Sequence, residues 1–219
     1  SPQTEGEVPG AAERFSDARS ASLIPAENPH PESHPKRPSA HPKSAAKGPS
    51  DTIDLARLQR AGMIVPDGKR TQISEEFRVI KRPLLLNAKR RDAGRARSNL
   101  IVVTSAFPNE GKTFSAINLA ISMSLELDHS VLLVDADVAQ PRRHDFLGLR
   151  PRKGLIDLLV DPKLTLAETV IHTNVERLEV LLAGPSHHHA NELLASESMT
   201  RLLNELEAVK AGALAAFGA

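Results

Sequence analysis

The sequence predicts an α/β fold, in which a mostly parallel sheet is flanked by helices, and three observations carry this prediction. An apolar, β-branched run at residues 100–104 leads into a short polar loop. Apolar residues at helical spacing follow over residues 112–127, and a second apolar run at 131–134 ends in the pair Asp135 and Asp137. Strand, loop, helix and strand at this spacing form a βαβ unit with parallel strands.

The length and composition narrow the class of protein. A chain of 219 residues has room for one domain of about 100–200 residues and a tail. Because 28 Lys and Arg oppose 27 Asp and Glu, no global basic field points to nucleic acid. The absence of Cys excludes disulfides and thiolate metal sites, and no apolar run approaches the roughly 18 residues of a membrane span. We therefore expect a cytoplasmic protein without a nucleic-acid partner.

Residues 1–50 are rich in Pro, Ser and His and poor in apolar side chains. Such a segment cannot offset the entropy lost on ordering, so the sequence predicts a disordered arm. Its spaced histidines, His30, His34 and His41, are expected to be solvated rather than metal ligands.

Residues 51–98 form a predicted helical pre-core segment that ends in a basic linker, AKRRDAGRARS. Ser74 is expected to cap a helix that Pro83 kinks or ends. Within this helix Glu75, Arg78 and Lys81 recur every three residues and so form one charged stripe, for which spacing alone favours a solvated face.

The loop after the first strand, residues 105–113, has the sequence SAFPNEGKT. A strand that enters a loop ending in Gly-Lys-Thr is typical of the phosphate-binding loop G-x-x-x-x-G-K-[ST], in which backbone N–H groups surround the phosphates, Lys binds the β/γ oxygens and the hydroxyl binds Mg²⁺. Ala106 replaces the first Gly of this pattern. The loop therefore makes nucleotide binding the working hypothesis.

Asp135 and Asp137 are predicted at the carboxyl end of the second strand, beside this loop. Ligands of open α/β sheets bind at that edge. Two carboxylates that end a buried strand are hard to explain as core residues, so we interpret both as functional.

The remainder of the chain carries weaker signals. The patterns predict a short helix at 155–160, a capping box of Thr165 and Glu168, a third strand at 178–184 and a last helix at 191–210. Three consecutive residues, His187 to His189, lack a Cys or carboxylate partner at ligand spacing and are not expected to bind metal. Residues 209–219, a tail of uncertain origin, show no clear element.

Taken together, several ordered motifs resemble the bacterial tyrosine kinases of exopolysaccharide export, most closely the exosortase-associated tyrosine autokinases. The resemblance covers residues 51–208. Its motifs are EEFRVIKRPLLLNA, the loop form S-x-x-P-x-E-G-K-T, VLLVDAD followed by Pro141, GLIDLL and NELLAS. The loop of this family tolerates a residue other than Gly at position 106.

The resemblance implies a P-loop NTPase-like fold with ATP and Mg²⁺ as cofactors. Lys112 would hold the β/γ phosphates, Thr113 would bind Mg²⁺ with Asp137, and Asp135 would be the base or orienting group for an attacking tyrosine hydroxyl. The residues implied to cradle the nucleotide are Pro108, Asn109, Glu110, Gly111, Lys112, Thr113 and Phe114.

The resemblance also implies partners. Glu75, Arg78 and Lys81 match the family's E-x-x-R-x-x-R oligomerisation motif with Lys in the last position, where it cannot make the bidentate contact of Arg. This shifts the interpretation of the stripe towards a homo-oligomer interface. A chain-length-determinant protein of the inner membrane would be the further partner, with the chain cytoplasmic and peripheral to that membrane.

Three features of the family are missing. The chain has no later strand of the form apolar-apolar-Asp-Ser-Pro-Pro and no Tyr, so it cannot phosphorylate itself on tyrosine. The Arg that usually follows Asp-x-Asp is also missing, with Ala139 and Gln140 in its place. We therefore expect residues 99–208 to be a partial kinase domain whose sheet is incomplete at the C-terminus and exposes apolar edges.

Three functions remain open from the sequence. The first is an ATP-dependent protein-tyrosine kinase of polysaccharide assembly. The second is a P-loop ATPase switch of the partitioning or division-site type, although the extra Lys of those loops is absent here. The third is a non-catalytic interaction module that keeps the fold.

Overall fold

The computed structural model describes residues 48–89, 99–138, 143–209 and 213–218. Residues 44–219 belong to one compact unit. The expectations for the arm up to residue 47, for its three histidines, for most of the basic linker and for Ala139 and Gln140 fall outside the described residues.

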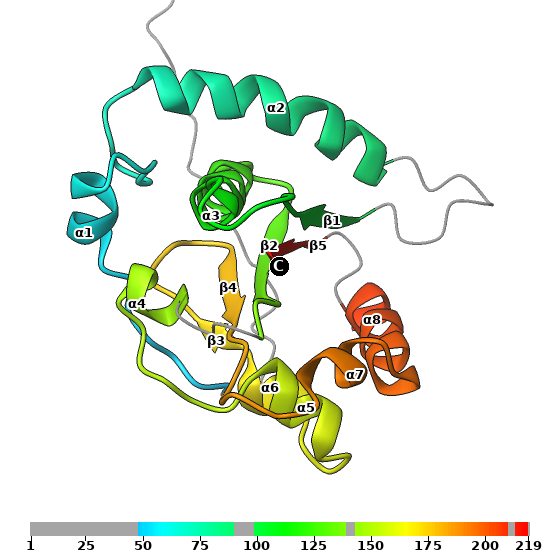
Figure 1. Cartoon of the computed structure of the whole chain (residues 1–219). Coiled ribbons are helices and arrows are strands. Elements are labelled where there is room, and N and C mark those ends of the chain that lie inside the picture. Colours follow the sequence, from blue (N-terminus) through cyan, green and yellow to red (C-terminus); the bar gives the residue numbers. More distant parts are fainter. Residues whose placement is uncertain (1–47, 90–98, 139–142, 210–212, 219) are drawn as a thin grey trace, which may run out of the picture. The chain divides into compact units, whose positions relative to one another are not determined.

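The sheet has five strands in the order β1-β5-β2-β4-β3 (Figure 1). Their bounds are Leu100–Val103 (β1), Ser130–Asp135 (β2), Ile171–His172 (β3), Leu178–Leu181 (β4) and Ala213–Gly218 (β5). Neighbouring strands are parallel except β3, which is antiparallel to β4. The predicted mostly parallel α/β sheet is confirmed.

The strand β5 was not predicted. Residues 209–219 showed no element signal, yet Ala213–Gly218 lies between β1 and β2 and pairs in parallel with both. Its sequence, ALAAFG, is dominated by Ala and Gly, which have low intrinsic strand propensity. Hydrogen bonds to strands on both sides stabilise the extended conformation that the local propensity of these residues does not favour. Among the described strands, β1 pairs with β5 alone.

Alternating side chains of β2 divide the core into two layers, as expected for a strand covered on both faces. Val131 and Leu133 join the apolar cluster under the helices α2 and α3, whereas Leu132 and Val134 join the cluster under α5 and α8. The helices are α1 Leu55–Arg60, α2 Gln72–Lys89, α3 Lys112–Ser124, α4 Arg143–Leu147, α5 Leu155–Val160, α6 Leu166–Thr169, α7 Ala190–Leu194 and α8 Glu197–Val209. Figure 1 shows α2 and α3 on one side of the sheet and α5 to α8 on the other.

The helix α2 differs from its prediction at both disputed residues. It begins before Ser74, because Oγ1 of Thr71 accepts a hydrogen bond of 3.2 Å from the N–H of Ser74, as the side chain of an N-cap does. It also continues through Pro83 to Lys89. Phe77, Leu84 and Leu85 pack against the core cluster, so tertiary contacts offset the backbone hydrogen bond that Pro83 cannot donate.

Two further predictions can be compared with the structure. The capping box is confirmed, since the backbone N–H and the hydroxyl of Thr165 donate to Oε2 of Glu168 at 2.9 and 2.7 Å. The predicted single helix at 191–210 is two helices, α7 and α8. They are separated at Ser196, whose hydroxyl donates to the carbonyl of Leu193 at 2.6 Å. Among the described residues, no helix has the length and apolar character needed to cross a membrane.

Candidate functional site

The phosphate-binding loop predicted from the sequence connects β1 to α3. Gly111 precedes the first residue of α3 and has φ of +95°, a conformation that side chains rarely adopt. A Cβ built on Gly111 would meet no atom within 4 Å, so the space in front of it is open. Asn109 also has positive φ, +67°. The loop thus has two residues with positive φ directly before a 13-residue helix.

Hydrogen bonds inside the loop fix its shape. The hydroxyl of Ser105 donates to the carbonyl of Phe107 at 3.0 Å, and the N–H of Phe107 donates to Oε2 of Glu110 at 3.0 Å. The N–H of Ser115 donates to the carbonyl of Gly111 at 2.8 Å and starts the helical ladder. Glu110 therefore stabilises the turn through a hydrogen bond within the loop.

The residues predicted to cradle a nucleotide fall into two groups. Pro108, Asn109 and Glu110 are exposed on the loop, whereas Lys112, Thr113 and Phe114 are partly buried in the first turn of α3. The sequence analysis missed Asn118, which is fully buried. Its amide donates to the carbonyl of Phe114 at 2.8 Å and accepts from the N–H of Ile64 at 2.8 Å, which ties the start of α3 to the segment before α2.

Asp135 ends β2 at the same edge of the sheet as the loop. Gly218 of β5 is in register with Val103 on one side and with Asp135 on the other. Two strand spacings separate the ends of β1 and β2, roughly 10 Å. The structure therefore brings the loop and the acidic pair to one edge, as the sequence predicted. Asp135 is 3% exposed, and its Oδ1 accepts a hydrogen bond of 3.1 Å from the N–H of Asp137.

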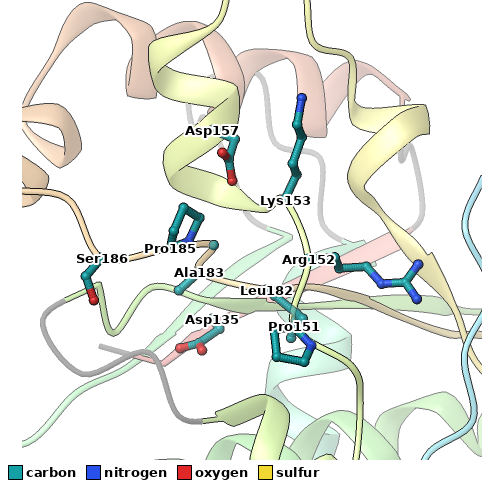
Figure 2. A pocket seen from close by; sticks show the side chains of 10 residues that line it. Asp135, Pro151, Arg152, Lys153, Asp157, Leu182, Ala183, Pro185 and Ser186 are labelled. Carbon is teal, nitrogen blue, oxygen red and sulfur yellow. The ribbon is translucent and has the colours of Figure 1, made fainter.

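Asp135 also lines a pocket of about 530 Å³ between β2, the end of β4 and the start of α5 (Figure 2). Asp157 of α5 lines the same pocket and accepts a hydrogen bond of 2.8 Å at Oδ2 from the N–H of Gly154. Gly184, with φ of +87°, lies so close to Asp157 that a Cβ would come within 2.7 Å of Oδ2. The sequence analysis named GLIDLL only as part of the family resemblance. Gly154 and Gly184 were the residues from which this close approach could have been predicted.

The charged stripe of α2 is divided in the structure. Glu75 and Arg78 form an ion pair of 3.4 Å with side chains that are 49% and 50% exposed. Lys81 is instead buried, 6% exposed, and its ammonium faces Ser122 and Glu126. The expectation of one solvated stripe is therefore wrong for Lys81, because α3 offers its ammonium a carbonyl and a carboxylate.

The rings of the consecutive histidines after β4 contact one another, with His187 and His188 stacked and His188 and His189 tilted. The ring centroids of His187 and His188 lie 4.6 Å apart, and those of His188 and His189 lie 4.0 Å apart. Within the part of the chain that the structure describes, no group of three or more His, Cys, Asp or Glu residues is arranged to hold a metal ion.

The fold and the loop define a class of protein: an α/β domain of the P-loop NTPase type, in which a loop ending in Gly-Lys-Thr connects the first strand to the following helix. No family model matches the chain. It is 31% identical over 150 residues to the tyrosine-protein kinase YwqD of Bacillus subtilis, covering 68% of this chain and 60% of that protein. It is also 31% identical over 166 residues to the succinoglycan biosynthesis transport protein ExoP of Rhizobium meliloti, covering 75% of this chain and 20% of ExoP.

Among solved structures, the kinase domain of the Escherichia coli tyrosine kinase ETK matches with a TM-score of 0.57. The match covers 74% of this chain and 71% of that domain at 21% identity, which establishes a shared fold. The chain is thus a homologue of the bacterial tyrosine-protein kinases. It spans about three fifths of the length of YwqD and one fifth of ExoP.

Proposed function

We propose that the chain is an ATP-binding protein-tyrosine kinase domain that regulates exopolysaccharide polymerisation or export. The observation that carries this proposal is the pairing of β5 with both β1 and β2, which sets the loop and Asp135 at one edge of the sheet. The similarity to ExoP, which is named as a succinoglycan biosynthesis transport protein, supports the link to exopolysaccharides.

The loop fits a nucleotide phosphate on its own geometry. The positive φ of Gly111 and the open space in front of it let an anion approach the backbone, and the first N–H groups of α3 have no partners within the helix. In the proposed complex Lys112 binds the β/γ phosphates of ATP, and Thr113 and Asp137 hold Mg²⁺. The bound ion neutralises charge on the phosphates.

Asp135 is the proposed catalytic residue together with Lys112. A carboxylate at the end of β2 would accept the proton of the tyrosine hydroxyl as that hydroxyl oxygen bonds to the γ-phosphorus of ATP. The bond from this phosphorus to the β–γ bridging oxygen would break, and ADP would leave. Oδ1 of Asp135 accepts a hydrogen bond from the N–H of Asp137, which fixes the orientation of the carboxylate at the end of β2. The 219 residues contain no Tyr, so none of them supplies this hydroxyl.

The proposed setting is the cytoplasmic side of the inner membrane. A chain-length-determinant protein of that membrane would recruit the domain. Glu75 and Arg78, both half-exposed on α2, are the proposed contacts between copies in a homo-oligomer.

Titration of the chain with Mg-ATP tests the first step, with Lys112→Ala as the matched variant. We expect saturable binding that weakens by at least tenfold in Lys112→Ala. Phosphate transfer to a Glu-Tyr copolymer then separates a kinase from an ATPase switch or a non-catalytic module. Binding and hydrolysis without transfer would favour the switch, and no binding at all would favour the module.

A further inference from the structure

A second pocket lies on the far side of Arg152 from the Asp135 pocket. It has a volume of about 470 Å³ and is lined by residues of three segments, among them Asp51, Thr52, Arg150, Arg152, His172 and Asn174. Arg152 lines both pockets, and Figure 2 shows its guanidinium turned away from Asp135. We call the second cavity the Arg150–Arg152 pocket.

The guanidinium of Arg152 is incompletely paired. Its Nη2 donates to Oδ2 of Asp51 at 3.3 Å, a single long contact. Its Nε is buried and has no hydrogen-bond partner among the residues that the structure describes. A guanidinium presents five donors in a fixed plane, and a buried donor is normally satisfied. The described residues therefore leave the donors of this guanidinium incompletely satisfied.

The carboxylate of Asp51 does not satisfy all the donors of Arg152, because each of its two oxygens also accepts a hydrogen bond from a backbone N–H group. Oδ1 accepts from the N–H of Thr52 at 2.9 Å, and Oδ2 accepts from the N–H of Arg150 at 3.1 Å. Burial raises the pKa of Asp51, but these two hydrogen bonds and the charges of Arg152 and Arg150 outweigh it and hold the pKa below its usual value. One ionised carboxylate thus faces two guanidinium groups.

Two other polar side chains of the pocket have partners of their own. His172 pairs through Nδ1 with Glu179 at 2.9 Å. The side-chain amide of Asn174 accepts from the N–H of Ile53 at 2.8 Å and donates to the carbonyl of Ile53 at 3.2 Å. The charged donors that line the pocket are the two arginines, whose two positive charges exceed the single negative charge of Asp51.

We propose that the Arg150–Arg152 pocket binds a small phosphate-type oxyanion, held by the guanidinium groups of Arg152 and Arg150. A tetrahedral oxyanion accepts parallel hydrogen bonds from the two Nη groups of a single Arg and still has oxygens for a second Arg. The phosphate is either free inorganic phosphate or the monoester group of a phosphorylated molecule. This site is separate from the phosphate loop and does not depend on the proposed kinase function.

Calorimetric titration of the whole Lys112→Ala chain with inorganic phosphate tests the proposal, since this variant weakens competing binding at the loop. Acetate and chloride at matched ionic strength are the control anions. We expect saturable phosphate binding that weakens at least tenfold in Lys112→Ala/Arg152→Gln and stays within twofold in Lys112→Ala/Arg57→Gln, which changes an exposed Arg of α1.

Two more variants keep the test decisive if Arg152→Gln fails to fold. Arg152→Lys keeps the charge but lacks the planar fork, and we expect a loss of at least threefold. Asp51→Asn removes the competing carboxylate, and we expect binding to strengthen severalfold. The absence of saturable binding, or equal binding by the Arg152 variants and the Arg57→Gln control, would overturn the site, as would weaker binding by Asp51→Asn.

A parallel titration with phenyl phosphate distinguishes the two sources. Tighter binding of phenyl phosphate than of inorganic phosphate supports a phosphorylated molecule as the ligand, and the reverse supports free phosphate. Failure of the site leaves Mg-ATP binding by the parent chain unaffected, so it is distinguishable from failure of the proposed function.

Discussion

The ammonium of Lys81 in α2 lies 2.8 Å from Oε1 of Glu126 and donates a hydrogen bond of 2.6 Å to the carbonyl of Ser122 in the last turn of α3. A cation is favourable there because the carbonyls at a helix C-terminus carry partial negative charge. Arg177 adds a second cation, with its Nε 3.2 Å from the carbonyl of Ser124. The helix that starts at the phosphate loop is thus anchored at its other end by two basic side chains.

Substitutions of the two partners are expected to differ in cost. Glu126→Ala leaves the buried ammonium of Lys81 with one carbonyl, whereas Lys81→Met removes the charge and keeps the packing of the stem. We expect Glu126→Ala to lower the free energy of unfolding by about 1 kcal/mol more than Lys81→Met, a value reduced because Glu126 is 45% exposed. Urea denaturation measures both, with Glu176→Ala as the control for an exposed ion pair. A larger loss in Lys81→Met would contradict the expected order.

The same pair predicts how stability depends on pH. The hydrogen bond from Lys81 holds the pKa of Glu126 below its usual value, against the opposing effect of burial. A carboxyl whose pKa is lower in the folded state contributes stability above its unfolded pKa of about 4.5, and this contribution is lost as pH falls through the folded pKa. The melting temperatures of the parent and of Glu126→Gln should differ at pH 7 and converge only as pH falls through the folded pKa, which lies below 4.5. A difference that is constant with pH would exclude this linkage.

Because Lys81 is buried and Arg78 is half-exposed, we expect the two residues to differ in their effect on the association of copies. Arg78→Ala changes a half-exposed side chain that contributes little to the fold, so its effect should fall on subunit association. Lys81→Met should leave association unchanged at equal folded fraction. Sedimentation velocity over a concentration series measures both. Loss of association in Lys81→Met alone would reverse this assignment.

The sequence predicted those parts of the site that local patterns encode. The apolar run before the loop, the Gly-Lys-Thr end and the acidic pair after 131–134 each lie where local rules put them. The direction of the Lys81 side chain was not predictable, because spacing every three residues records a helix face but not the neighbour that covers part of it. Asn118 was missed for the same reason, since its partner Ile64 is distant in sequence.

The strand β5 is the element of the fold that local sequence patterns did not predict. Its Ala- and Gly-rich sequence lacks β-branched residues and alternation, so nothing local distinguishes it from a loop. Its conformation is set by two neighbours that are available only once β1 and β2 have formed. The sequence analysis found no strand of the family form that ends in Asp, and β5 is not such a strand, because residues 213–218 contain no acid.

The central position of β5 predicts an unequal effect of two substitutions at one residue. Ala215 pairs with Leu100 on one side and with Leu132 on the other. Ala215→Pro removes the backbone N–H and disrupts the ladder of a central strand, whereas Ala215→Gly keeps the N–H and costs about 1 kcal/mol. We expect Ala215→Pro to abolish Mg-ATP binding and cooperative unfolding, and Ala215→Gly to keep both. Equal behaviour of the two variants would show that β1 does not depend on β5.

The role proposed for Asp135 predicts a loss of transfer without a loss of binding. Asp135→Asn keeps an oxygen that accepts the hydrogen bond from the N–H of Asp137, so the turn after β2 should persist. The amide cannot take a proton from an acceptor hydroxyl, and we expect transfer to a Glu-Tyr copolymer to fall by about 100-fold or more. The affinity for Mg-ATP should change less than about threefold, because Asp135 is not among the proposed nucleotide or metal ligands. Asp137→Asn is the matched control, since it should instead raise the Mg²⁺ concentration needed for transfer. Retained transfer in Asp135→Asn would move the proton acceptor to another group.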